Sequence, residues 1–224
     1  TSVSLNEAVT VQGDVNLTTD TLMVNAALTA ADNGALKLTT ATADRDMAVD
    51  MATEQTGGLT LTTAEFDRIS GFTSQRFEAT GELSMGTADT TFELSRDTEL
   101  FSGGVMNLNA IGSAEGSSFD LLLNSGTGNL ELNAIDLSGD LTVVSVGDIT
   151  QATETTITIA GLADLTTTGN DITLGTGSDA FTSSTLRLSA HNVILTDTAA
   201  GITFSGDPYM TGDLDLTAQE TITD

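Results

Sequence analysis

The 224 residues carry 32 acidic and 6 basic side chains, a formal charge of −26 at pH 7, with 39% hydrophobic residues and no cysteine. The charge excludes nucleic acid as a partner, because binding to phosphates needs a basic surface. The lack of thiols excludes disulfides, a cysteine nucleophile and a thiolate metal site. The apolar fraction is enough for a folded core, and no apolar run reaches the roughly 20 residues of a membrane span.

Apolar and polar residues alternate with period two along most of the chain, a pattern that predicts short, half-buried strands. Gly, Asn, Asp and Ser bound these runs, and they tolerate tight turns. In chain order, clear examples are residues 9–11, 36–38, 59–61, 157–159, 186–188 and 214–216.

One segment, residues 62–69, breaks the alternation and predicts a short helix on a loop. Thr62 and Glu65 have the spacing of a capping box, which is a helix-start signature. Alternation also fades over residues 40–56 and 62–80. We therefore expect loop excursions near these two ranges.

A repeat unit recurs through the whole chain. It consists of a turn residue, usually Gly, then one further residue, then an apolar–any–apolar triplet. Copies begin at residues 13, 34, 57, 81, 104, 128, 147, 170, 191 and 212, with a mean spacing of about 22. An additional copy begins at Gly139, and we expect it on another face of the same coil.

A period of this length with short strands and no long helix is typical of a parallel β-helix. We predict a single all-β domain over residues 1–224, a solenoid of about ten coils and about 48 Å in length from the usual strand spacing. A leucine-rich repeat needs a consensus frame that is missing here, and a propeller period is about twice as long. A β-sandwich would not repeat one motif in this way.

Four stretches carry a family resemblance: GGLTLTTAEFDRI (57–69), GDLTVVSVGDITQ (139–151), NDITLGTG (170–177) and LSAHNVILTDTAAGITFSG (188–206). They resemble the repeat regions of filamentous-haemagglutinin-like exoproteins. Those are bacterial surface or secreted proteins, often exported by two-partner secretion, with long right-handed β-helical shafts. The resemblance implies a right-handed β-helix in an extracellular or cell-surface adhesin, and it transfers no site residues to this chain.

The sequence assigns no catalytic, cofactor-binding or metal-binding residue. His191 is the single histidine. It occupies a turn position before a predicted strand, and we expect a structural or solvated role. Glu65 and Asp67 lie on the predicted helical turn, where acidic residues near a helix start are favoured by its dipole.

Calcium is the inorganic partner that this composition suits best, because hard cations take carboxylate and carbonyl oxygens. Asp44, Asp46 and Asp50 form the densest acidic loop, and Arg45 interrupts it. We therefore expect no cofactor and no dedicated calcium site, and the acidic surface leaves open only weak, distributed calcium binding.

The leading functional interpretation is a non-enzymatic shaft or filament subunit of an adhesin or matrix protein. Open solenoid ends expose unpaired strands, so we expect a continuing chain or head-to-tail stacking of copies. The alternative is a carbohydrate-active enzyme or a glycan-binding module on the same scaffold. In that case the excursions near 40–56 and 62–80 would recognise a host receptor or glycan.

Overall fold

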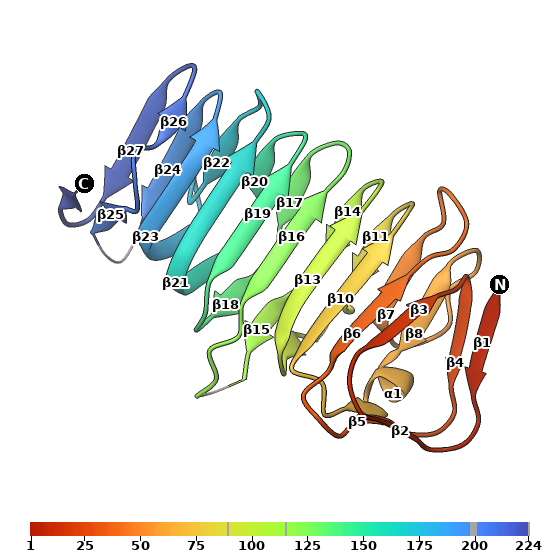
Figure 1. The fold of residues 1–224 in the computed structure, drawn as a ribbon. Helices are drawn as coiled ribbons and strands as arrows, with labels where there is room; N and C mark the ends of the chain where they lie inside the picture. Colours follow the sequence, from red (N-terminus) through yellow and green to blue (C-terminus); the bar gives the residue numbers. More distant parts are fainter. Residues whose placement is uncertain (89, 115, 198–200, 224) are drawn as a thin grey trace.

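The structure is a computed structural model that describes residues 1–88, 90–114, 116–197 and 201–223. The chain winds into a β-solenoid of about ten turns with a period near 22 residues. Strands of successive coils pair in parallel, and the two termini lie at opposite ends of an elongated stack (Figure 1). The predicted parallel β-helix is confirmed.

Face 1 of the solenoid is the longest uninterrupted sheet, because each strand pairs with the equivalent strand of the next coil. Its strands are β3 (Val15–Thr18), β6 (Ala35–Thr39), β10 (Ser74–Ala79), β13 (Asp97–Ser102), β16 (Leu121–Ser125), β19 (Leu141–Ser145), the second halves of β21 (Thr156–Thr167) and β23 (Ala180–Ala190), and β26 (Tyr209–Met210).

Face 2 follows face 1 along the chain in each coil. In stacking order it contains β1 (Ser2–Leu5), β4 (Thr21–Val24), β8 (Leu59–Thr62), β7 (Met47–Met51), β11 (Leu83–Met85), β14 (Met106–Leu108), β17 (Leu130–Leu132), β20 (Ile149–Gln151), β22 (Ile172–Leu174), β24 (Val193–Asp197) and β27 (Leu214–Ala218). Strands β8 and β7 belong to the same coil, so this face has one strand more than the coil count requires.

Face 3 closes each coil. It contains β2 (Val9–Val11), β5 (Leu28–Ala30), β9 (Ile69–Ser70), β12 (Phe92–Leu94), β15 (Ile111–Ser113), β18 (Ile135–Leu137) and the first halves of β21 and β23. At the C-terminal end, β25 (Ile202–Phe204) pairs with the second half of β23, and β28 (Ile222–Thr223) pairs with β25.

The core consists of rows of inward side chains, because alternate residues of a strand point to the same side and equivalent strands stack in register. On face 1, one fully buried row runs through Leu38, Phe77, Leu100, Leu123, Val143, Leu165 and Leu188. A second row near the corner with face 2 is polar. There the hydroxyls of Ser102 and Thr167 donate to the turn carbonyls of Val105 and Asn170 at 2.8 and 2.7 Å.

The predicted helix is present and is shorter than expected. Helix α1 covers Thr63–Phe66, and the Glu65 carboxylate accepts hydrogen bonds from the Thr62 amide at 3.1 Å and the Thr62 hydroxyl at 2.8 Å. The ranges expected as loop excursions, 40–56 and 62–80, contain strands β7 and β10. The irregular backbone in these ranges is therefore limited to the segments between the strands.

The repeat series requires one correction. The copies beginning at Gly13 and Gly34 lead into β3 and β6 on face 1, whereas the copies from Gly57 onward lead into face 2. The additional copy at Gly139 leads into β19 on face 1, on another face as expected. The series crosses faces because every corner that precedes a strand uses the same turn chemistry, so the pattern does not distinguish one corner from another.

Candidate functional site

The corner before face 2 carries a ladder of Asp and Asn side chains. The Oδ1 atom of each accepts the backbone N–H of its equivalent one coil further along. The amide of Asp148 donates to Asn129 at 3.0 Å, and the amide of Asp171 donates to Asp148 at 3.0 Å. The amide of Asn192 donates to Asp171 at 3.0 Å, and the amide of Asp213 donates to Asn192 at 2.8 Å. The sequence places an acceptor directly before each strand, so the side chain continues the hydrogen-bond ladder past the strand end.

A second ladder lies at the corner before face 1. Asp97 accepts the amide of Asp120 at 3.1 Å, Asp120 accepts that of Asp140 at 2.8 Å, and Asp140 accepts that of Leu162 at 2.8 Å. These carboxylates line a shallow groove of about 280 Å³ together with Glu99.

Both ladders form acidic surfaces, and in each ladder one oxygen of a side chain accepts a backbone hydrogen bond from the next coil. Among the described residues, no group of three or more Asp, Glu or His side chains is arranged to hold a metal ion. The ladders form hydrogen bonds that join successive coils.

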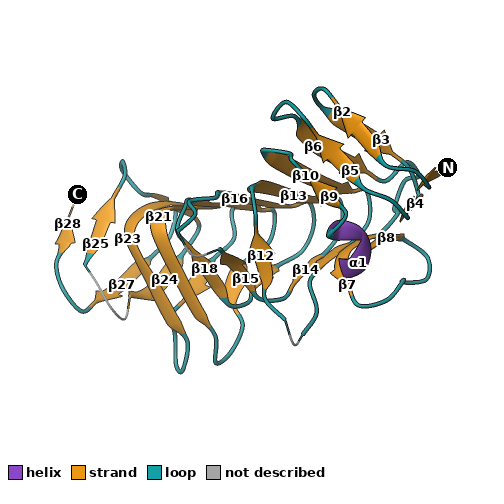
Figure 2. Cartoon of the chain, turned by 90° about the horizontal axis from the view of Figure 1, so that it is seen from below, coloured by secondary structure: helices purple, strands orange, loops and turns teal. Residues whose placement is uncertain are grey.

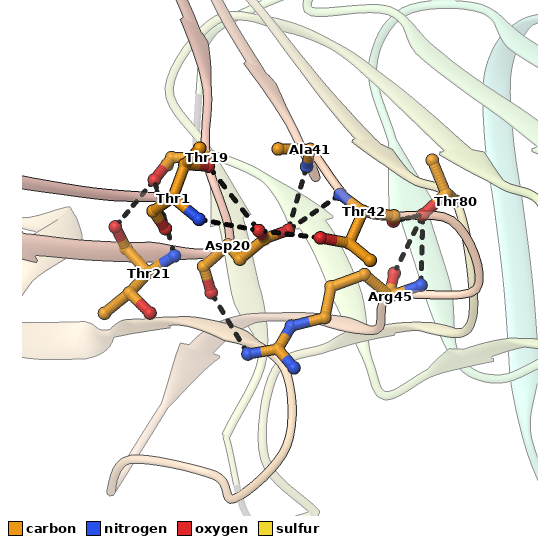
Figure 3. A network of polar contacts seen from close by, with 8 residues as sticks. All are labelled: Thr1, Thr19, Asp20, Thr21, Ala41, Thr42, Arg45 and Thr80. Atoms are coloured by element: carbon orange, nitrogen blue, oxygen red, sulfur yellow. Dashed lines mark hydrogen bonds and ion pairs between the residues drawn. The ribbon is translucent and has the colours of Figure 1, made fainter.

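A denser polar network surrounds Asp20, which precedes β4 and is buried (Figure 3). Its Oδ1 accepts the amides of Ala41 and Thr42 at 3.1 and 2.8 Å. Its Oδ2 accepts the Thr42 hydroxyl at 2.8 Å and the amino nitrogen of Thr1 at 2.9 Å. These hydrogen bonds, led by the one from the Thr1 ammonium, hold the pKa of Asp20 well below its ordinary value.

The network fixes the irregular backbone between β6 and β7. Arg45 donates to the Asp20 carbonyl at 3.4 Å, and the amide of Arg45 donates to the Thr80 hydroxyl at 3.0 Å. The Thr80 hydroxyl also contacts the Thr42 carbonyl at 2.6 Å. Three coils are thus joined around one carboxylate, which indicates a structural centre.

Basic side chains gather on the outer surface of face 1. Lys37 and Arg76 form ion pairs with Glu78 at 2.8 and 3.2 Å, and Arg76 also pairs with Glu99 at 3.2 Å. The Arg76 guanidinium lies 3.6 Å from the centre of the Phe101 ring. The hydrogen bond from Lys37, with its charge and that of Arg76, lowers the pKa of Glu78.

The sequence candidates lie apart from one another. His191 is exposed, and its Nδ1 lies 2.9 Å from the Thr211 hydroxyl. Asp67 is exposed at the end of α1. Glu65 is buried, and its Oε1 accepts the amide of Val24 at 2.9 Å. None of these contacts forms a pairing of nucleophile and base.

The acidic loop separates into three different roles. Asp44 is exposed in a left-handed turn conformation. Asp46 accepts the amide of Glu82 at 2.9 Å and so acts as a ladder residue. Asp50 occupies a bulge in β7 with φ of 58°, and burial, together with the charge of Asp67, raises its pKa. Burial likewise raises the pKa of Glu54, and the neighbouring Glu65 adds to the effect.

The polar ladders and the Asp20 network were not predicted from the sequence. A signal for the ladders is present, because Asp or Asn recurs at the position before the apolar triplet, as in Gly147-Asp148 and Gly212-Asp213. The Asp20 network has no comparable signal, because its partners Ala41 and Thr42 lie outside the repeated motif.

The fold and its surfaces define a β-solenoid repeat protein. In the described part of the chain, no helix has the length and apolar character needed to cross a membrane. Residues 119–187 match a family described as repeats of unknown function (DUF5649). No curated protein matches the chain, and neither does any solved structure.

Proposed function

We propose that this chain is a non-enzymatic structural segment, a stiff shaft within an extracellular or cell-surface protein of the adhesin or matrix kind. The observation that carries the proposal is the continuous in-register sheet of face 1, from β3 to β26, over a fully buried apolar row. Such a stack resists bending because every coil is hydrogen-bonded to the next. The extracellular assignment rests on the resemblance of the repeats to filamentous exoproteins.

The coil at the C-terminal end supports a further part of this proposal. Leu214 and Ile222 are 41% and 46% exposed there. Their equivalents in the preceding coil, Val193 and Ile202, are fully buried. Exposed strand edges with apolar neighbours favour pairing with another coil. We infer that another coil covers this surface, either from the same longer polypeptide or from a second copy.

Sedimentation velocity over a range of concentrations tests the stacking of copies. The test variant is Leu214→Lys. The control is Val146→Lys, because Val146 is 51% exposed and lies in the middle of the rod. Assembly that grows with concentration and is lost only in Leu214→Lys supports stacking. Equal behaviour of both variants and the parent would contradict it.

The shaft itself is tested by electron microscopy and by assaying hydrolysis of a panel of polysaccharides. Straight rods that leave every polysaccharide intact support the structural role. Release of reducing ends by the parent protein, with a matched loss in Asp120→Asn, would favour the carbohydrate-active alternative instead.

A further inference from the structure

The backbone ladder between coils is interrupted on two faces near the N-terminal end, after β4 on face 2 and after β9 on face 3. On face 2, β4 pairs with β1 and β8 pairs with β7, and the two pairs belong to separate sheets. On face 3, β9 pairs with β5 and β12 pairs with β15, again in separate sheets. Face 1 continues without interruption through β6, β10 and β13.

The cause is the long coil that follows β6. Leu36 and Gln75 are paired neighbours on face 1, although 39 residues separate them in the chain. This coil supplies both β7 and β8 to face 2, and only one strand to each of the other faces. An additional strand adds about 4.8 Å to one face, so the coils on either side cannot remain parallel. Figure 2 shows β2, β3, β5 and β6 set at an angle to the strands of the rod.

Charged side chains replace the missing backbone partners at both interruptions. At the end of β4, the Val24 amide donates to Glu65 at 2.9 Å, and the Val24 carbonyl accepts from Arg68 at 2.6 Å. At the start of β9, the carbonyl of Ile69 accepts a hydrogen bond from the buried Arg96 at 3.3 Å.

Helix α1 fills the space between the two interruptions. The Phe66 ring lies 5.3 Å from that of Phe92 and 6.3 Å from that of Phe77, measured between centroids. Both rings belong to strands of the rod, Phe77 to β10 and Phe92 to β12, so these contacts attach α1 to the rod side of the interruptions.

We propose that these interruptions form a hinge, at which strands β1–β6 and β9 open as a unit from the rest of the rod and pivot on face 1. Opening breaks side-chain contacts such as those of Val24 with Glu65 and Arg68, of Ile69 with Arg96 and of Asp20 with Arg45, but no backbone ladder on face 2 or face 3. Separating coils at any other place breaks backbone ladders on at least two faces. Regions held by few hydrogen bonds and contacts open at lower free energy than the whole domain. The inference does not depend on the proposed shaft function.

A third interruption, between β14 and β17 on face 2, provides an internal comparison. There β13 pairs with β16 on face 1 and β15 pairs with β18 on face 3, so two ladders continue across it. We expect that position to stay closed.

Distances between spin labels test the hinge directly, because the chain has no native cysteine. One doubly labelled protein carries Thr10→Cys and Glu93→Cys, exposed residues of β2 and β12 on opposite sides of the hinge. The control carries Asp136→Cys and Thr203→Cys, exposed residues of β18 and β25 in the rod. A broad or two-peaked distribution for the first pair and a narrow one for the second supports the hinge. Equally narrow distributions would overturn it.

Hydrogen exchange gives an independent measurement at Val24. Glu65→Ala removes the acceptor of the Val24 amide, and Glu131→Ala, at an exposed residue of β17, is the control. We expect exchange of that amide to accelerate about tenfold in Glu65→Ala, the effect of losing about 1.4 kcal/mol. Amides of β16 should keep their rates. If β16 accelerates equally, the N-terminal strands do not open as a separate unit.

Discussion

The backbone amide of Asp171 donates a 3.0 Å hydrogen bond to Oδ1 of Asp148, its equivalent in the preceding coil. The oxygen of Asp171 in turn accepts the amide of Asn192. The side chains thereby extend the inter-coil ladder beyond the strand ends, at corners where the backbone turns away.

Removal of one ladder acceptor should destabilise the rod. We expect Asp148→Ala to lower the free energy of unfolding by about 1–2 kcal/mol, since the amide of Asp171 loses its charged acceptor. Chemical denaturation measures the change. Asp136→Ala, at an exposed position of β18, should alter stability by less than about 0.5 kcal/mol. Equal losses in the two variants would contradict a role for the ladder.

The stability of the rod should depend on the volume of the side chains in the buried row of face 1. Phe77 is fully buried between Leu38 and Leu100 on face 1. Phe77→Ala should cost about 3–5 kcal/mol because it removes buried apolar area and leaves a cavity. Thermal unfolding followed by circular dichroism measures the loss. The exposed Val146→Ala is the control and should leave the melting temperature almost unchanged.

Two glycines just after β22 allow the cost of backbone strain to be distinguished from the cost of a steric clash. Gly175 and Gly177 have φ of 67° and 68°, but a Cβ at Gly175 would collide with the carbonyl oxygen of Thr196, whereas a Cβ at Gly177 meets nothing within 4 Å. Gly177→Ala should therefore cost about 1–2 kcal/mol, the price of a left-handed alanine.

Gly175→Ala should cost clearly more than Gly177→Ala, because the strand of the next coil would have to move. Denaturant midpoints of the two variants, measured side by side, provide the comparison. Equal midpoints would show that the coils can separate at this corner without a large penalty.

Glu78 should contribute to the pH dependence of stability. Its pKa in the folded protein is lowered, first by the hydrogen bond from Lys37, so the folded state binds this proton more weakly than the unfolded state. The resulting stabilisation is present above the ordinary glutamate pKa of about 4.3 and is lost as the pH falls through the lowered value. Glu78→Gln should reduce the loss of stability between about pH 5 and pH 3, whereas Glu131→Gln serves as the exposed control.

The opposite sign applies to Asp50 and Glu54, whose folded pKa values burial raises. The folded state binds these protons more tightly, so their ionisation lowers stability as the pH rises through the raised values. Asp50→Asn should remove part of this loss above about pH 5. A stability profile identical to that of the parent protein would contradict it.

The sequence by itself determined the strands, the coil period and the class of fold. In a solenoid the neighbour of each strand lies about one period away along the chain, so alternation and turn residues are nearly sufficient to predict the stack. The capping-box spacing of Thr62 and Glu65 likewise predicted a helix, because its partners are three residues apart.

Only the tertiary structure decided which face each repeat copy occupies and how the long coil after β6 places two strands on face 2. It also decided from which donors the carboxylates of Asp20 and Glu65 accept hydrogen bonds. These features depend on register between segments 20 to 40 residues apart, such as Asp20 with Thr42 and Glu65 with Val24. A one-residue shift in stacking would assign different partners to the same side chains, and local propensity carries no information about that shift.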